Sequence, residues 1–170
     1  YILSNGKDQS AKLWDVRMVM SPQKYEQIKN TRISNHSRFD YRFGRYNDNF
    51  WYKDPHDCSL VTYRGHRVLK TLIRCHFSPP RSTNSRYIYS GSEDGKVYIW
   101  NLDATLAGIV DVYRTTKPNT NIMDSEDPGR RRKAYEVEDW STCVRDASWH
   151  PTAPVIATSA WNGYDARNGT

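Results

Sequence analysis

Short runs in which apolar residues alternate with polar or small ones recur along the chain, separated by turn residues. Such alternation is typical of β-strands that bury one face. Residues 87–90 and 96–101 are two clear examples. Between them, Glu93-Asp94-Gly95 is a turn in which the glycine can take a positive φ. The pattern predicts an all-β chain built from short antiparallel strands.

The strand-turn-strand pattern is repeated. Residues 1–15 align with residues 87–101 without a gap, and Tyr, Ile, Ser, Asp and Trp coincide; residues 72–79 match 144–151 in the same way. Residues 156–163 are a third, less regular copy. Self-similarity of this kind indicates stacked structural units. We expect two middle strands of one unit within 2–15 and its outer strand at 59–63, a complete unit at 72–77, 87–90, 96–101 and 109–113, and a third unit opening at 144–149 and 155–159.

Several short motifs in these repeats resemble those of the WD-repeat family: Gly65-His66, Ser90-Gly91-Ser92, Asp94-Gly95, Trp100-Asn101 and Trp14-Asp15. The resemblance implies a β-propeller of four-stranded blades, which typically number about 4–8. Residues 1–170 would then form a partial WD-repeat propeller of about two to three blades, the rest of the ring lying in further sequence. The resemblance also implies a structural network in which Asp94 orients His66, His66 bonds Ser90, and Ser90 bonds the indole of Trp100.

Two stretches interrupt the repeats, at about 18–58 and 115–139. The first is long enough to hide a degenerate blade, but it has no Gly-His, Ser-Gly-Ser or turn-then-Trp pattern, so we expect an insertion. Its basic and aromatic residues, densest at 38–43, would either dock it on the propeller or bind single-stranded nucleic acid. The second stretch joins an acidic block to the basic run 130–133. It suggests a solvated loop, or alternatively a nuclear-import or anion-binding patch.

The first repeat ends in Leu13-Trp14-Asp15-Val16-Arg17, and nothing in a propeller requires an arginine at that place. Strand alternation would place Asp15 and Arg17 on the same side of the chain, at the rim. The planar guanidinium of arginine suits such a site because it can make bidentate contacts. The arrangement resembles the box through which WD-repeat substrate receptors dock on the damaged-DNA-binding adaptor of cullin-4 ligases. This resemblance implies adaptor contact by Trp14, Asp15 and Arg17.

Nearly the whole chain, apart from the two insertions, is similar to one subfamily of such receptors. That subfamily comprises the eleventh cullin-4-associated factor of animals and its plant LEC-type relatives, and the similarity is carried by 7–17, 40–42, 62–66, 71–75, 88–91 and 143–151. Asn5 departs from the box, where a small residue is usual. The resemblance implies a substrate-receptor subunit of a cullin-4 RING E3 ubiquitin ligase, with the adaptor and a protein substrate as partners. The alternative is a general WD-repeat scaffold in RNA-processing or chromatin complexes.

Composition limits the partners, cofactors, activities and compartments that we expect. A net charge of +6 permits contact with acidic partners, but it is modest for a chain of this size, so we do not expect nucleic acid as the main partner. The three cysteines form no C-x-x-C pair, and we expect neither a metal nor another cofactor. No catalytic motif is present, so we expect a non-catalytic scaffold. No signal peptide or long apolar run is visible, which favours the nucleus or cytoplasm over a membrane.

Overall fold

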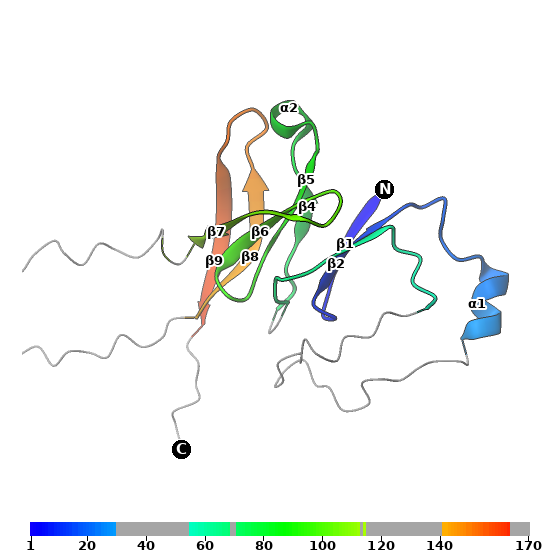
Figure 1. The fold of residues 1–170 in the computed structure, drawn as a ribbon. Coiled ribbons are helices and arrows are strands. Elements are labelled where there is room, and N and C mark those ends of the chain that lie inside the picture. Colours follow the sequence, from blue (N-terminus) through cyan, green and yellow to red (C-terminus); the bar gives the residue numbers. More distant parts are fainter. Residues whose placement is uncertain (30–54, 69–70, 113, 115–140, 164–170) are drawn as a thin grey trace, which may run out of the picture.

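Three antiparallel sheets lie side by side in the described part of the chain (Figure 1). The computed structural model describes residues 1–29, 55–68, 71–112, 114 and 141–163. The first sheet has the order β1-β2-β3, the second β4-β5-β6-β7, and the third β8-β9. The strands are β1 (Ile2–Gly6), β2 (Ser10–Trp14), β3 (Val61–Tyr63), β4 (Cys75–Phe77), β5 (Tyr87–Gly91), β6 (Lys96–Asn101), β7 (Leu106–Asp111), β8 (Ser141–Trp149) and β9 (Ile156–Gly163).

This arrangement confirms the predicted partial propeller, with one complete four-stranded blade. The two middle strands pair as the aligned repeats require, with Ile2 opposite Trp14 in the first sheet and Ile88 opposite Trp100 in the second. Several strand limits differ from expectation, most clearly those of β4 and β7. β4 begins only at Cys75, because Leu72 lies outside the ladder with 73% of its surface exposed. β7 covers Leu106–Asp111 instead of 109–113, because its register follows from pairing with β6.

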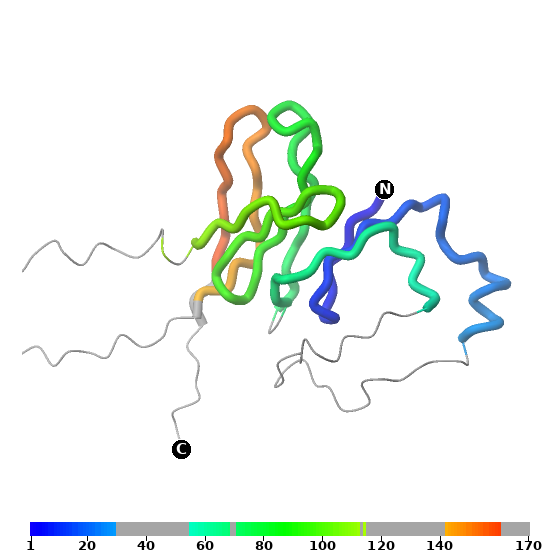
Figure 2. Tube along the Cα trace, viewed as in Figure 1, coloured from blue at the N-terminus to red at the C-terminus, as the bar shows by residue number. Residues whose placement is uncertain are grey.

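The outer strand of the first sheet lies far along the chain from its neighbour. β3 pairs with β2, with Ala11 opposite Tyr63 and Leu13 opposite Val61, so residues 15–60 connect two adjacent strands of one sheet. Such a connection fits an insertion within a blade. Figure 2 shows the segment 55–68, coloured teal, running from the first sheet toward the second. The insertion residues 30–54, including the basic and aromatic run 38–43, lie outside the described residues, as does the whole of 115–139.

Short helices are also present among the described residues. Helix α1 (Pro22–Ile28) lies in the insertion, where the Ser21 hydroxyl accepts a hydrogen bond from the Lys24 N–H and Pro22 occupies the first turn. Helix α2 (Pro80–Thr83) connects β4 to β5 and ends at Asn84, which has a φ of 56°. Neither described helix has the length and apolar character needed to cross a membrane.

Each sheet buries a face against the next one. Between the first and second sheets lies a cluster of Ala11, Leu13, Tyr63, Ile88, Tyr98 and Trp100, and between the second and third lies a cluster of Tyr89, Val97, Val112, Val144 and Ala147. Full burial of a large apolar side chain stabilises a fold by about 1.5–3 kcal/mol. The inter-sheet clusters therefore hold the blades together, since a single sheet has no core of its own.

Candidate functional site

A hydrogen-bonded turn over residues 15–18, here called the docking turn, follows β2. The Met18 N–H donates to the Asp15 carbonyl at 2.9 Å, and the Arg17 N–H donates to Asp15 Oδ1 at 2.9 Å. Asp is favoured at the first position of such turns because its side chain can accept this second bond. The predicted proximity of Asp15 and Arg17 is thus present. The expected reason was wrong, because β2 ends at Trp14 and the turn, not strand alternation, brings the two side chains together.

Asp15 and Arg17 form a close ion pair. Arg17 Nε lies 3.0 and 3.2 Å from the two carboxylate oxygens of Asp15, and Nη2 lies 2.6 Å from Oδ2. The Asp15 side chain is 8% exposed, whereas the Arg17 side chain is 77% exposed. The side-chain bonds from Arg17, followed by its backbone N–H, lower the pKa of Asp15 to about 2, and the same bonds raise the pKa of Arg17. The pair therefore stays ionised near neutral pH and fixes an exposed guanidinium on a buried carboxylate.

Trp14 supports the turn from the end of β2. Its indole Nε1 donates to the Ser4 hydroxyl on β1 at 2.8 Å, and Lys12 Nζ lies 5.8 Å from its ring centroid. Lys12 in turn pairs with Asp57 at 2.8 Å, and the Asp57 side chain is only 4% exposed. These contacts fix the Trp14 ring on its own sheet. Of the three predicted docking residues, Arg17 is consequently the one that offers a polar group to a partner.

The second repeat contains an equivalent turn, with an acidic residue in the place of Arg17. The Ala104 N–H donates to the Asn101 carbonyl at 3.0 Å, as Met18 does to Asp15. Asp103 takes the place of Arg17, and its carboxylate accepts from the Thr105 N–H at 2.9 Å and the Thr105 hydroxyl at 2.6 Å. The backbone of the docking turn is thus a feature of the repeat, while the arginine is particular to the first copy.

The residues predicted to form the blade network lie near one another, but their hydrogen bonds differ from those expected. Asn5 Oδ1 can only accept, so the His66 Nε2–H donates to it at 2.8 Å, and Asn5 Nδ2 donates to the Ser90 hydroxyl at 3.0 Å. The Trp100 indole donates to the Arg64 carbonyl at 3.0 Å. The expected bond from His66 to Ser90 was therefore wrong, because Asn5 of the preceding blade lies between the two side chains. The expected bond from Ser90 to Trp100 was also wrong, because the indole donates to the Arg64 carbonyl instead. Sequence reasoning treated Asn5 only as a departure from the family box.

His66 is the buried centre of this network. It is 2% exposed, its ring lies edge-on to Trp100 with 5.1 Å between centroids, and burial lowers its pKa to about 4 although Asp8 and Asp94 oppose the shift. Asp94 accepts from the Tyr98 hydroxyl at 2.9 Å. Neither His66 Nδ1 nor Asp94 Oδ1 has a hydrogen-bond partner within the described part of the chain. His66 is thus held neutral, as suits a structural residue.

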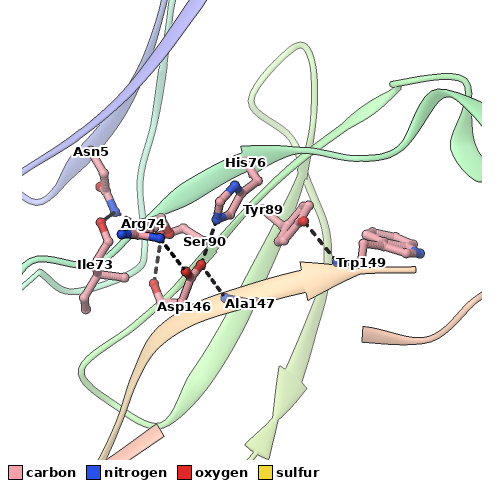
Figure 3. Close-up of polar contacts among 10 residues, drawn as sticks. Asn5, Ile73, Arg74, His76, Tyr89, Ser90, Asp146, Ala147 and Trp149 are labelled. Atoms are coloured by element: carbon pink, nitrogen blue, oxygen red, sulfur yellow. Dashed lines mark hydrogen bonds and ion pairs between the residues drawn. The ribbon is translucent and has the colours of Figure 1, made fainter. Parts of the chain in front are cut away.

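A second polar cluster, which the sequence did not reveal, joins the second and third sheets (Figure 3). Asp146 on β8 lies 2.7 Å from His76 Nε2 and 3.2 Å from Arg74 Nη1, and these bonds lower the pKa of Asp146 against the effect of burial. The Tyr89 hydroxyl accepts from the Trp149 N–H at 3.1 Å. These contacts tie neighbouring blades together. The matching of 72–79 with 144–151 located β4 and β8 but not their first residues, and it carried no signal of which side chains face each other.

The described residues offer little for metal chemistry. No group of three or more His, Cys, Asp or Glu side chains within them is placed to hold a metal ion. Cys58, Cys75 and Cys143 form no disulfide with one another, and burial raises the pKa of Cys75 to about 11. A thiol with a raised pKa is a poor nucleophile near neutral pH. The docking turn is therefore the site that the geometry supports best.

Comparison with known proteins places these features in a family. Residues 57–101 match the sequence model described as WD domain, G-beta repeat. The chain is 40% identical to the LEC14B homolog of Prunus armeniaca, with 98% of this chain and 29% of the relative aligned. It is 37% identical to the LEC14B protein of Lithospermum erythrorhizon, with 96% and 28% aligned, and 34% identical to the DDB1- and CUL4-associated factor 11 homolog of Caenorhabditis elegans, with 96% and 24% aligned.

The chain thus spans between about a quarter and three tenths of the length of these relatives. The strand arrangement, the matched repeat and the relatives all indicate the same family. This chain is part of a WD-repeat protein, and over nearly its whole length it is a homologue of the proteins named LEC14B and DDB1- and CUL4-associated factor 11.

Proposed function

We propose that the protein containing this chain is a substrate receptor of a cullin-4 RING E3 ubiquitin ligase, and that the docking turn binds the DDB1 adaptor. Two of the relatives carry DDB1 and CUL4 association in their names. The single observation that carries the proposal is the Arg17 guanidinium, held on a buried Asp15 and left 77% exposed. A preorganised side chain loses little conformational freedom on binding, so its contacts contribute more fully to affinity.

The remainder of the propeller would present the substrate. A receptor needs no catalytic group, because holding a protein substrate near the ligase's transfer machinery raises its effective concentration there. Ubiquitination followed by proteasomal degradation is the expected outcome. The nucleus and the cytoplasm are the compartments in which we propose that this happens.

The proposal is tested by purifying the full-length tagged protein from cells and quantifying the adaptor and cullin-4 that accompany it. Wild type should bring down both, and Arg17→Ala should lose both. Asp103→Ala is the matched control, because it removes a charged side chain from the equivalent turn of the next repeat. If wild type instead purifies with RNA-processing or chromatin proteins and without the adaptor, the general scaffold function replaces the ligase function.

A further inference from the structure

Arg17 lies within an exposed apolar stretch. Val16, Met18 and Val19, here called the apolar collar, expose 50%, 62% and 62% of their surface. The equivalent turn of the second repeat has one exposed large apolar residue, Leu102 at 43%, followed by Asp103 and Ala104. Clusters of exposed apolar residues mark interaction surfaces more often than single ones do. The collar is therefore a second feature, besides the arginine, that sets the first turn apart.

The charge of this surface is already balanced within the chain. Asp15 accepts from both Nε and Nη2 of Arg17, with separations of 2.6 to 3.2 Å, so one positive and one negative charge lie in the same turn. A partner carboxylate brought to Arg17 would also approach the carboxylate of Asp15, and like charges repel. An uncharged surface with carbonyl or hydroxyl acceptors meets no such repulsion.

We infer that the apolar collar and Arg17 form one docking surface that fits an uncharged, apolar patch of the adaptor, with neutral oxygen acceptors for the guanidinium. This inference rests on the proposed function and specifies the chemistry of the contact. The composition agrees with it, because the centres of protein interfaces are enriched in apolar side chains, Met and Arg, and are depleted of Asp, Glu and Lys. Arginines surrounded by apolar contacts are also common among the residues that dominate binding energy.

The inference gives two measurable consequences. Replacing Met18 and Val19 together by Ser removes exposed apolar surface, so the dissociation constant for purified adaptor should rise about tenfold or more. The association rate should change less than about threefold between 0.1 and 0.5 M NaCl, because charge steering contributes little to a neutral contact.

The experiment titrates full-length protein with purified adaptor for wild type, Met18→Ser/Val19→Ser, Arg17→Ala and the control Leu102→Ser, each checked for an unchanged thermal midpoint. We expect the collar variant and Arg17→Ala both to weaken binding and Leu102→Ser to stay within about twofold of wild type. If the collar variant binds like wild type while Arg17→Ala does not, or if the association rate falls steeply with salt, the neutral-surface inference is overturned and the proposed function stands. If Arg17→Ala also binds like wild type, the proposed function fails as well.

Discussion

Asn5 and Gly91 occupy equivalent positions in the two aligned repeats, but they contact the following blade differently. The Asn5 amide donates to the Ile73 carbonyl at 3.1 Å and to the Ser90 hydroxyl at 3.0 Å, so a side chain bridges the first and second sheets. At Gly91 the third sheet lies directly against the backbone, and a Cβ built there would lie 2.2 Å from the Val144 carbonyl oxygen. The two junctions therefore respond differently to substitution.

The tight junction is tested by Gly91→Ala. A methyl group 2.2 Å from a backbone oxygen cannot be accommodated without moving β5 away from β8, and overpacking of this kind costs about 1–3 kcal/mol or more. We expect a clear drop in the thermal midpoint of the full-length protein. Gly108→Ala on β7 is the control, because a Cβ there meets nothing within 4 Å, and its midpoint should stay unchanged or rise slightly. Equal effects of both substitutions would contradict the junction described.

The bridged junction is tested by Asn5→Ala. This change leaves His66 Nε2 and the Ile73 carbonyl without their present partner, and a buried polar group that loses its bond costs about 1–3 kcal/mol. We expect a lower free energy of unfolding by urea denaturation. The control, Asn101→Ala, removes an exposed bond to Thr105 and should cost less than about 1 kcal/mol. An Asn5→Ala protein as stable as the control variant would show that the bridge is unimportant.

Burial of His66 predicts a pH dependence of stability. Its pKa falls from 6.5 when unfolded to about 4 when folded, so the unfolded chain takes up the proton first. The stability contribution is fully present above about pH 6.5 and is lost as the pH falls toward 4, by roughly 3 kcal/mol in total. The pH profile of the free energy of unfolding measures it. His66→Gln should flatten the profile in this window, and an unchanged slope in that variant would assign the effect to other groups.

The Asp15 carboxylate affects stability in a lower pH range than His66 does. The pKa of Asp15 is lowered from 3.8 to about 2 by its bonds from Arg17, so its contribution is present above pH 3.8 and is lost as the pH falls toward 2. The pH profile below 4 should therefore respond to Asp15→Asn, while the slope between 4 and 6.5 should not. A change of the upper slope in Asp15→Asn would contradict this separation.

Strands and repeats were predictable because they depend on local periodicity. Alternation placed β5 and β6 almost to the residue, and the gapless alignment transferred that assignment to β1 and β2. β7 was displaced because its apolar run fits several registers, and only the pairing of Lys96 with Asp111 and of Trp100 with Leu106 selects one. The short helix α1 was missed, although Ser21-Pro22 is a recognised start signal, because the segment has no buried face to give it a periodic pattern.

Contacts between blades were not predictable, because they depend on side chains that meet across the fold. Gln9 illustrates this. It has a φ of 61° where the second repeat has Gly95, and its amide bonds both the Val68 N–H at 2.8 Å and the Val68 carbonyl at 3.1 Å. These two bonds to Val68, in the segment that connects β3 to β4, offset the unfavourable backbone conformation of Gln9. Arg17 was identified from its motif alone, but the turn that orients it required the structure.

The central claim is that Arg17, oriented by Asp15, is what the adaptor binds. The most direct test is the dissociation constant between purified DDB1 adaptor and full-length protein for wild type, Arg17→Ala, Arg17→Lys and Asp103→Ala. We predict that both Arg17 variants weaken binding by at least about tenfold, Lys included because it lacks the planar fork, and that Asp103→Ala changes it less than about twofold. Folded Arg17→Ala protein that binds the adaptor as tightly as wild type would contradict the account.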